Sequence, residues 1–211
     1  MTKRSRPRPT RALEAEGPAP ICGVDEAGRG PWAGPVVAAA VILNPARIPE
    51  GIDDSKRLTA ARREALLADL LRHADIGIGR SDVAEIDELN ILQASHLAMR
   101  RAVLDLRTSP AMALIDGNLV PSGLECQCRP IIGGDARCLS IAAASIVAKV
   151  TRDRMMVALS QQFPGYGWGT NMGYGTKAHA DGLARLGVTP HHRRSFKPIH
   201  KILCEADYLN P

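Results

Sequence analysis

Two apolar runs joined by a glycine-rich link constrain the fold of this chain most. Residues 21–25 predict a short strand, and the Val- and Ala-rich run over 35–43 predicts a second strand that pairs with it. The link between the two runs suits a tight loop, since it contains Gly28, Gly30 and Gly34. We therefore expect the ordered part of the chain to begin near residue 20 with a strand pair.

Helical and extended patterns alternate after this pair, which predicts an α/β domain with a mixed sheet and a helix-rich C-terminal part. Asn90 and Gln93 resemble a capping box that opens a helix, and Ser140 is expected to cap another. The predicted elements are, in chain order, a helix over 59–73, a strand at 76–78, a helix over 90–106, strands at 113–115 and 130–132, helices over 141–161 and 176–187, and a short final helix after 190.

The first 18 residues are rich in Arg and Pro and offer almost nothing to bury. We expect residues 1–18 to be a disordered basic tail and residues 19–211 to form one domain, whose C-terminal helical region starts at about residue 160. The tail is either a solvated segment without a role or an electrostatic tether to phosphates. Its basic residues are Lys3, Arg4, Arg6, Arg8 and Arg11.

Composition narrows the class of protein. A chain of 211 residues with 45% hydrophobic content is an ordinary size for one domain, and only 3% aromatics means a core of Ala, Val, Ile and Leu. The net charge of +5 favours polyanionic partners such as nucleic acid. No apolar run is long enough to span a bilayer and no secretory signal is evident, so we expect a cytoplasmic protein, taken as a monomer.

The five cysteines have no spacing that indicates a metal site or a disulfide framework. Cys126 and Cys128 are one residue apart and no second pair follows nearby, which argues against zinc. Free thiols are the simpler interpretation, and they fit a reducing cytoplasm.

Four carboxylates follow or end predicted strands, where burial is costly unless their charge is neutralised. Asp25 and Glu26 end the first strand, Asp116 ends the strand at 113–115, and Asp135 follows two glycines ahead of the helix at 141. If they converge at one sheet edge, Mg²⁺ or Mn²⁺ would resolve their repulsion. Two such ions about 3.5–4 Å apart can activate a water and stabilise the leaving oxygen of a phosphodiester.

Each acid also has a simpler explanation. Asp25 and Glu26 before a glycine loop are often only a turn, and Asp116-Gly117 is a common turn pair. Asp135 could accept hydrogen bonds from local backbone amides. Patterns of this kind do not establish that the four side chains meet.

Several long motifs follow one another over about residues 20–200. They are Gly23-Val24-Asp25-Glu26-Ala27-Gly28-Arg29-Gly30-Pro31, continuing through Ala33–Ala40, then Asp53-Asp54-Ser55-Lys56, Ile86–Gln93, Ile115-Asp116-Gly117-Asn118, Gly134-Asp135, Ser140–Val150, Gly173-Tyr174-Gly175-Thr176 and His192-Arg193-Arg194-Ser195-Phe196. These motifs, in this order, resemble those of the ribonuclease HII family. The Gly28-Arg29-Gly30 triplet favours type HII over the sister type HIII.

The resemblance implies a ribonuclease H-like fold with a mixed five-stranded sheet flanked by helices and a helical C-terminal extension. It implies two Mn²⁺ or Mg²⁺ ions on Asp25, Glu26, Asp116 and Asp135. The implied activity is endonucleolytic hydrolysis of the RNA strand of RNA/DNA hybrids, and cutting on the 5′ side of single ribonucleotides in duplex DNA. The products would carry a 3′-hydroxyl and a 5′-phosphate, which would start ribonucleotide excision repair.

The resemblance also implies residues that recognise the substrate. The ribose 2′-hydroxyl in the minor groove distinguishes RNA from DNA, and Gly28, Arg29 and Gly30 would approach it with their backbone. Tyr174 would contact that hydroxyl and stack on the neighbouring deoxyribose; without the family, a structural aromatic in a glycine turn is the simpler interpretation. Candidate phosphate contacts, each of which could equally be a solvated charge, are Lys56, Lys177, Arg193, Arg194 and Lys197.

Two departures from the family pattern concern substrate contacts. Gly133 stands where the family usually has a lysine, and residues 167–172 lack the charges often found before the Gly-Tyr-Gly turn. His191 and His192 are expected at the surface or facing phosphate, because a hard Mg²⁺ site does not call for histidine. The rival hypotheses are a recombination-type or type HIII nuclease on the same fold, and a binding module without catalysis, against which the four intact acids argue.

Overall fold

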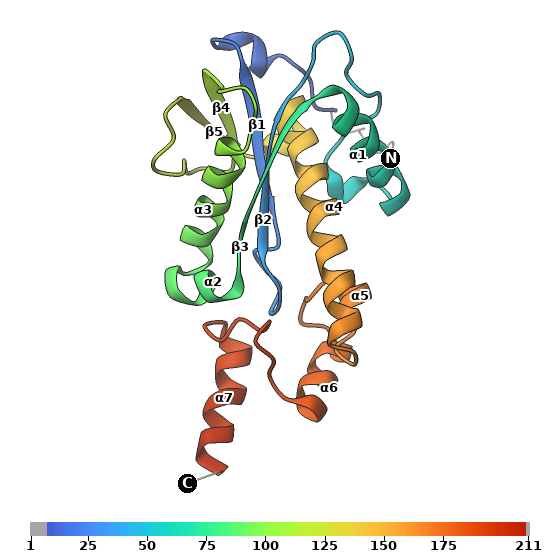
Figure 1. The fold of residues 1–211 in the computed structure, drawn as a ribbon, viewed down its shortest axis with the longest axis vertical. Coiled ribbons are helices and arrows are strands. Elements are labelled where there is room, and N and C mark those ends of the chain that lie inside the picture. Colours follow the sequence, from blue (N-terminus) through green and yellow to red (C-terminus); the bar gives the residue numbers. More distant parts are fainter. Residues whose placement is uncertain (1–7, 210–211) are drawn as a thin grey trace, which may run out of the picture.

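The computed structural model describes residues 8–209, so Lys3, Arg4 and Arg6 of the predicted tail lie outside the described residues. Its centre is a five-stranded sheet in the order β3-β2-β1-β4-β5 (Figure 1). β1 pairs antiparallel with β2 and parallel with β4, so the predicted mixed sheet is confirmed. The strands are β1 (Ile21–Ala27), β2 (Val36–Ile42), β3 (Asp75–Ser81), β4 (Met112–Asp116) and β5 (Gln127–Ile131).

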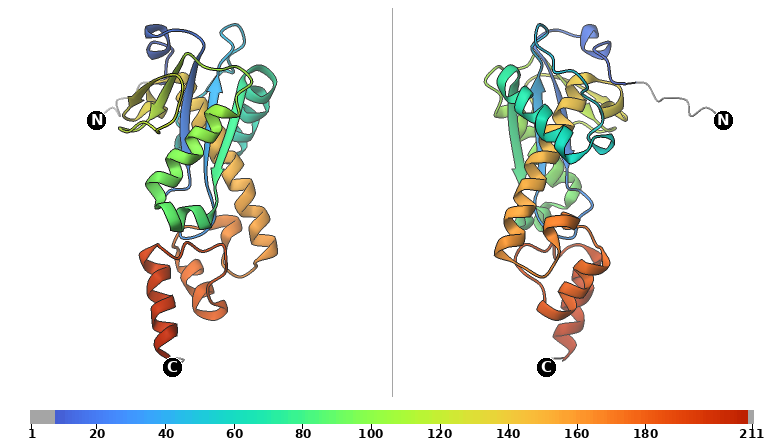
Figure 2. Two further views of the ribbon diagram at one scale, coloured as in Figure 1. Left: turned by 60° about the vertical axis from the view of Figure 1, so that its left-hand side comes forward. Right: turned by 90° about the vertical axis from the view of Figure 1, so that its right-hand side faces the viewer.

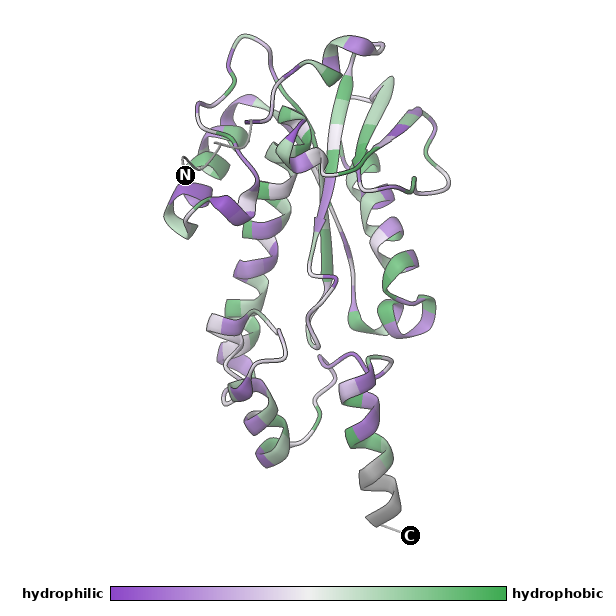
Figure 3. Cartoon of the chain, turned by 180° about the vertical axis from the view of Figure 1, so that it is seen from behind, coloured by the Kyte–Doolittle hydropathy of each residue, from purple (hydrophilic) through white to green (hydrophobic). Residues whose placement is uncertain are grey.

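Helices cover both faces of this sheet, as two further views show (Figure 2). One face is covered by α1 (Ala60–His73) and α4 (Leu139–Gln162), and the other by α2 (Val83–Leu89) and α3 (Ile91–Leu104). Alternation along β2 divides the core: Ala39 and Val41 pack with α1 and α4, while Val36, Ala38 and Ala40 pack with α3. Hydrophobic stretches of the strands alternate with hydrophilic segments (Figure 3).

Glycine in the strands lets the helices approach the sheet closely. A Cβ on Gly23 of β1 would lie 2.2 Å from the backbone of Ser140 and Ile141 in α4. On β3, a Cβ on Gly77 or Gly79 would lie 2.0 Å from a carbonyl oxygen of α3. The buried core on both faces of the sheet is therefore built mainly from Ala, Val, Ile and Leu, as the composition predicts, and Phe196 packs against it.

The C-terminal helices lie beyond one end of the sheet and enclose a separate small core (Figures 1 and 2). This region holds α5 (Trp168–Asn171), α6 (Lys177–Leu186) and α7 (Lys197–Leu209). Its buried side chains are more aromatic than those of the sheet and include Tyr166, Trp168, Met156, Leu183 and Ile199. Thr176 caps α6 and Gly187 ends it, which confirms the predicted bounds of that helix.

The N-terminal segment is ordered earlier than expected. Thr10 forms a backbone bridge with Cys138, and a 3₁₀ helix covers Leu13–Glu16. The carboxylate of Glu14 accepts a hydrogen bond from the backbone N–H of Ser140 at 2.7 Å, in the first turn of α4. An anion there satisfies a free amide and favours the helix dipole, so the expected boundary at residues 18–19 is wrong for residues 10–16.

Other predicted bounds need smaller corrections. Helix α4 begins at Leu139 after Cys138, so Ser140 lies inside it and is not its cap. The helix predicted from Asn90 is confirmed, since the Asn90 side chain accepts from the amides of Leu92 and Gln93. Helix α2, which starts with a capping box of Asp82 and Glu85, was not predicted. No helix in residues 8–209 is long and apolar enough to cross a membrane.

Candidate active site

Asp25 and Asp116 lie at the same edge of the sheet because β1 and β4 run parallel. Their register pairs Val24 with Ile115, so the next residue of each strand is one of these aspartates. Asp25 is 5% exposed, and Glu26 follows it within β1. Asp25 Oδ1 accepts from the backbone N–H of Glu26 at 2.7 Å, which fixes the orientation of its carboxylate.

Asp135 joins these residues through a backbone hydrogen bond. Asp116 Oδ1 accepts from the N–H of Gly134 at 2.7 Å, which ties the end of β4 to the 3₁₀ helix Gly134–Ala136. Asp135 lies in that helix and is 7% exposed. We call Asp25, Glu26, Asp116 and Asp135 the acid edge; the structure thus brings all four predicted acids to one region.

The acid edge carries more negative charge than its surroundings neutralise. Burial, with repulsion from Glu26 and Asp116, raises the pKa of Asp25 well above its usual value of 3.8. Burial also raises the pKa of Glu26, although Arg29 opposes that shift. The pKa of Asp116 is raised by burial and by Asp135. Protonation, or a bound cation, would relieve this repulsion.

Two lysines stand beside these acids. Lys56 Nζ lies 3.2 Å from Asp135 Oδ2. Burial alone would lower the pKa of Lys56, but its contact with Asp135 outweighs this and the pKa is raised. Lys149 pairs with Asp153 at 2.7 Å instead. Lys56 therefore lies at the acid edge, and its predicted contact with phosphate stays a prediction.

A cavity of 340 Å³ opens at this edge. Asp25, Glu26 and Asp116 line it together with Lys56 and Tyr174. The rest of its lining comes from Ala27, the Gly28-Arg29-Gly30 triplet, Ser55 and three residues of α4, namely Ser145, Lys149 and Arg152. A larger cavity of 510 Å³ between β3, α2 and α4 has a mostly apolar lining and lacks these acids.

The donor chemistry of the acid edge fits a hard divalent cation, because its ligands would all be carboxylate oxygens. Within residues 8–209, however, no three His, Cys, Asp or Glu side chains are gathered closely enough to hold a metal ion. The four carboxylates are close enough to repel one another, but they are not arranged to bind one ion together. Asp135 also forms an ion pair with Lys56. Side-chain rotations would therefore have to accompany cation binding.

The glycine triplet and Tyr174 lie side by side in the lining of this cavity. Gly28 has a φ of +101°, a conformation that favours glycine, and follows β1 directly. A Cβ on Gly30 would lie 3.4 Å from Cε1 of Tyr174, whose side chain is 48% exposed. We call the loop 28–35 and the turn 172–175 the recognition slot.

Two predicted surface residues prove to be buried. Arg193 is fully buried and donates to the carbonyl oxygens of Gly28, Arg29 and Gly34, so its predicted direct contact with phosphate is wrong. His192, expected at the surface, is also fully buried and lies 3.0 Å from His179 between their Nε2 atoms. A sequence cannot show that a basic residue is needed inside to satisfy loop carbonyls.

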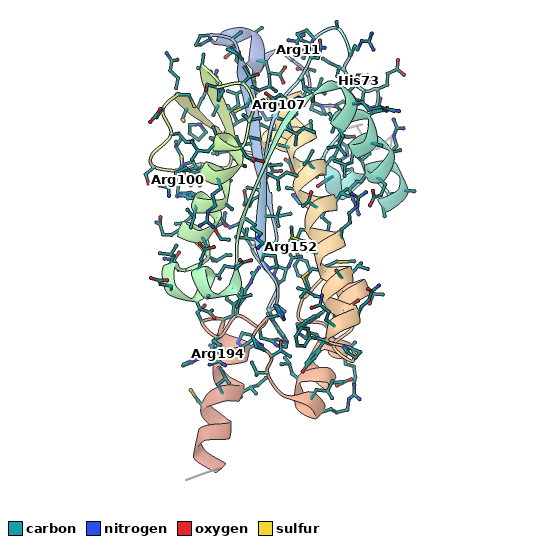
Figure 4. All side chains as sticks on the ribbon, viewed as in Figure 1. Arg11, His73, Arg100, Arg107, Arg152 and Arg194 are labelled. Carbon is teal, nitrogen blue, oxygen red and sulfur yellow. The ribbon has the colours of Figure 1, made fainter. Side chains whose placement is uncertain are left out.

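The other predicted contacts stay exposed. Lys177 begins α6 and pairs with Asp181 at 2.8 Å, and Lys197 begins α7. The backbone N–H of Arg194 donates to Asp87, which fixes this residue at the entrance to α7 (Figure 4). Gly133 has a φ of +63°, and a Cβ added there would meet no atom within 4 Å, so the position where the family has lysine is open. Their roles toward substrate stay predictions.

Sequence reasoning missed Arg152, which projects from α4 toward the sheet (Figure 4). It is 1% exposed, lines the cavity and donates to the carbonyl oxygens of Ala33, Pro35 and Met172. One sequence signal could have indicated a buried arginine. Arg152 lies three residues after Lys149, in a predicted helix whose side facing the sheet is otherwise mainly apolar. The five cysteines are free, as predicted.

Solved structures share this architecture. The crystal structure of ribonuclease H2 from Pyrococcus horikoshii matches with a TM-score of 0.74 and 29% identity, covering 90% of this chain and 99% of that one. Bst-RNase HIII in complex with Mn²⁺ matches with a TM-score of 0.67 and 21% identity, covering 89% of this chain and 70% of that one. The fold is that of the type 2 ribonucleases H, with a mixed sheet and C-terminal helices.

The sequence comparisons define the family. The ribonuclease HII family model matches residues 22–199. Ribonuclease HII of Cereibacter sphaeroides is 64% identical over 200 residues, which are 95% of this chain and 94% of the relative. The chain belongs to the ribonuclease HII family, and it is an endoribonuclease that acts on RNA/DNA hybrids.

Proposed function

We propose that this endonuclease also cuts duplex DNA on the 5′ side of a single embedded ribonucleotide and leaves a 3′-hydroxyl and a 5′-phosphate. One observation carries the proposal: a single cavity is lined by three carboxylates of the acid edge and by Tyr174 with the glycine triplet. A group that identifies a ribose and groups suited to hydrolysis are therefore within reach of the same nucleotide.

Recognition is assigned to the slot. The 2′-hydroxyl is both a donor and an acceptor, and the backbone of Gly28, Arg29 and Gly30 can approach it because two of these residues have no side chain. The exposed ring of Tyr174 would cover the sugar on the neighbouring deoxynucleotide. Together they would detect one RNA-to-DNA junction without reading the base sequence.

Hydrolysis is assigned to the acid edge. Asp25, Glu26, Asp116 and Asp135 would hold two Mg²⁺ or Mn²⁺ ions, which activate a water and stabilise the leaving 3′ oxygen when bound. The repulsion that raises the pKa of Asp25, Glu26 and Asp116 supports this role, because each bound dication would offset it. When a cation binds, the ion pair between Lys56 and Asp135 would break. The Lys56 ammonium would then be able to contact the phosphate.

Positioning of the duplex is assigned to the exposed basic side chains. Lys177 begins α6, Lys197 begins α7, and Arg194 lies at the entrance to α7. Contacts of this kind hold phosphates without regard to sequence and weaken with salt. The expected substrate partners are RNA/DNA hybrids and ribonucleotide-containing duplex DNA.

The test is cleavage of an end-labelled DNA duplex that contains one ribonucleotide, with Mg²⁺, with Mn²⁺ and with EDTA. We expect a cut on the 5′ side of the ribonucleotide with either metal and none with EDTA. Cleavage of a continuous RNA/DNA hybrid without cleavage of this duplex would overturn the proposed junction recognition. A cut on the 3′ side, or cleavage in EDTA, would overturn the assigned chemistry.

A further inference from the structure

Two buried arginines connect the parts of the recognition slot. Arg193 donates from Nε to Gly34 at 2.9 Å, from Nη1 to Arg29 at 2.9 Å and from Nη2 to Gly28 at 2.6 Å, in each case to the carbonyl oxygen. All three acceptors lie in the loop 28–35. Its guanidinium also stacks over Phe196, with Cζ 5.0 Å from the ring centre.

Arg152 joins this loop to the opposite turn. Its Nε donates to Pro35 at 2.9 Å and its Nη2 to Ala33 at 3.1 Å, while its Nη1 reaches Met172 at 2.9 Å, again at carbonyl oxygens. Met172 directly precedes the Gly173-Tyr174-Gly175 turn. Arg152 is thus the side chain that spans both sides of the slot.

Burying two positively charged side chains costs folding stability, which argues that they do more than fill space in the core. Arg152 and Arg193 are both nearly without exposed surface, and their side-chain hydrogen bonds within residues 8–209 all go to carbonyl oxygens. Burial lowers the pKa of Arg193 to about 9, with repulsion from Arg152 as the next cause. Two like charges are therefore held side by side and satisfied mainly by carbonyl groups.

The turn that carries Tyr174 is held in a strained conformation. Met172 has a φ of +51°, which is uncommon for a residue with a side chain, and its carbonyl is the one that Arg152 holds. The turn is seated tightly, because a Cβ on Gly175 would lie 2.0 Å from the ring of Trp32. The backbone N–H of Trp32 donates to the carbonyl of Gly173 at 2.8 Å.

A chain of buried side chains holds the Tyr174 backbone from the other side. His179 Nδ1 lies 3.0 Å from the Tyr174 carbonyl, which can only accept, so this nitrogen carries the proton. His179 Nε2 then accepts from Trp168 Nε1 at 3.1 Å and from His192 Nε2 at 3.0 Å. His192 Nδ1 accepts in turn from Thr189.

We propose that Arg152 and Arg193 are positioning residues that set the width of the recognition slot, with Arg193 fixing the glycine triplet and Arg152, helped by His179, fixing the Tyr174 turn against it. This inference rests on the proposed function, because it deepens the account of how a junction is recognised. Guanidinium is suited to this role, since its planar fork presents donors on three nitrogens in fixed directions, whereas an ammonium group donates from a single nitrogen.

The two arginines should differ in their effect on substrate choice. Arg193→Lys should lower kcat/KM about tenfold or more on a single-ribonucleotide duplex and on a continuous hybrid alike, because both need the glycine triplet. Arg152→Lys should lower kcat/KM on the single-ribonucleotide duplex about tenfold more than on the hybrid, because it frees the Tyr174 turn. Arg101→Lys is the control, since Arg101 also donates to a carbonyl, that of Arg80, but lies on α3.

Two substitutions at His179 separate an effect on substrate choice from an effect on folding stability, because each keeps one of the two contacts of the ring. Asn at this position keeps a donor near Nδ1, and Gln keeps a polar group near Nε2. We expect His179→Gln to lower the ratio of single-ribonucleotide to hybrid cleavage with a small loss of Tm. His179→Asn should keep that ratio and lose more Tm, because Trp168 and His192 lose their acceptor.

The ratio of kcat/KM on the two substrates is the deciding measurement. A lower ratio for Arg152→Lys with an unchanged ratio for Arg193→Lys supports the positioning roles. The positioning roles would be overturned if Arg152→Lys and Arg193→Lys had the same ratio of kcat/KM on the two substrates. They would also be overturned if the variants lost Tm but kept the wild-type kcat/KM on both substrates. If the wild-type protein cuts only the hybrid, the proposed function fails separately, and the positioning roles then stand or fall on whether Arg193→Lys lowers kcat/KM on the hybrid.

Discussion

The acid edge and the recognition slot are neighbours that handle buried charge in opposite ways. At the acid edge, three carboxyl groups have raised pKa values because burial and mutual repulsion are not balanced by cations within the chain. In the slot, two buried guanidiniums donate to six carbonyl oxygens and hold their loops in place. The negative charge of the acid edge is therefore not balanced within the chain, whereas the guanidinium donors of the slot have acceptors within it.

The difference suggests a division of labour between chemistry and recognition. A site that binds a cation must keep negative charge available, which costs stability until the cation arrives. A site that measures a sugar needs a fixed backbone, because a displacement of about 1 Å can cost about 100-fold in rate. Under the proposed function, the protein would combine both by placing an edge of unbalanced negative charge beside a loop and turn whose backbone is held by many hydrogen bonds.

The largest expected effect comes from neutralising the acid edge. Asp25→Asn should reduce cleavage by about 10³-fold or more, since several kcal/mol of charge stabilisation at the phosphate would be lost. Binding of the hybrid in EDTA should remain, because the slot is unchanged. Steady-state cleavage and a binding titration measure the two quantities, and Asp69→Asn on α1 is the matched control.

The same variant should be more stable than the wild-type protein when metal is absent. Because the folded-state pKa of Asp25 lies above its usual value of 3.8, ionisation costs folding stability as pH rises through the interval between them. Asn removes that cost at neutral pH, so Tm in EDTA should rise, by roughly 2–4 °C for each kcal/mol regained. A lower Tm would contradict the raised pKa of Asp25, and normal cleavage in Mg²⁺ would show that the Asp25 carboxylate is not needed for the metal-dependent reaction.

A smaller effect is expected from the exposed side of the slot. Tyr174→Ala should lower kcat/KM on the single-ribonucleotide duplex about tenfold more than on a continuous hybrid, as expected for one hydrogen bond and one stacking contact. Tyr174→Phe separates the two, because it keeps the ring and loses the hydroxyl. Equal losses on both substrates would remove Tyr174 from junction recognition.

The smallest effect concerns the contact of Glu14 with the first turn of α4. Glu14→Ala removes the acceptor for the Ser140 amide and should lower stability by about 1 kcal/mol, or roughly 2–4 °C in Tm, without changing kcat/KM. Glu16→Ala is the matched control, since Glu16 forms an exposed pair with Arg129. An unchanged Tm in the Glu14 variant would mean that the N-terminal segment does not stabilise α4.

Most of the sheet could be predicted from the sequence because its strands are apolar and its turns are marked by glycine. The bounds of α4 could not, because the group that satisfies its first turn is Glu14, far away in the sequence. The same contact orders a segment whose composition alone indicates a disordered tail. Helix α2 carried a local signal, the Asp82 and Glu85 capping box, which could have been found.

The residues of the candidate site also divide into those that could be predicted from the sequence and those that could not. Its acids could be predicted because carboxylates at strand ends are conspicuous, and the parallel pairing of β1 with β4 brings Asp25 beside Asp116. The buried partners could not, because Arg152 and Arg193 are needed by carbonyl groups of loops whose paths only the fold defines. Arg193 in particular sits in a basic stretch that resembles a phosphate-binding surface.

The central claim is that recognition is complete without metal while chemistry is not. Its most direct test is binding of two matched duplexes in EDTA, one all-DNA and one with a single ribonucleotide, followed by addition of Mg²⁺ or Mn²⁺. We predict tighter binding of the ribonucleotide duplex in EDTA with no cleavage, and cleavage once metal is added. Equal binding of both duplexes in EDTA, or cleavage before metal is added, would contradict the claim.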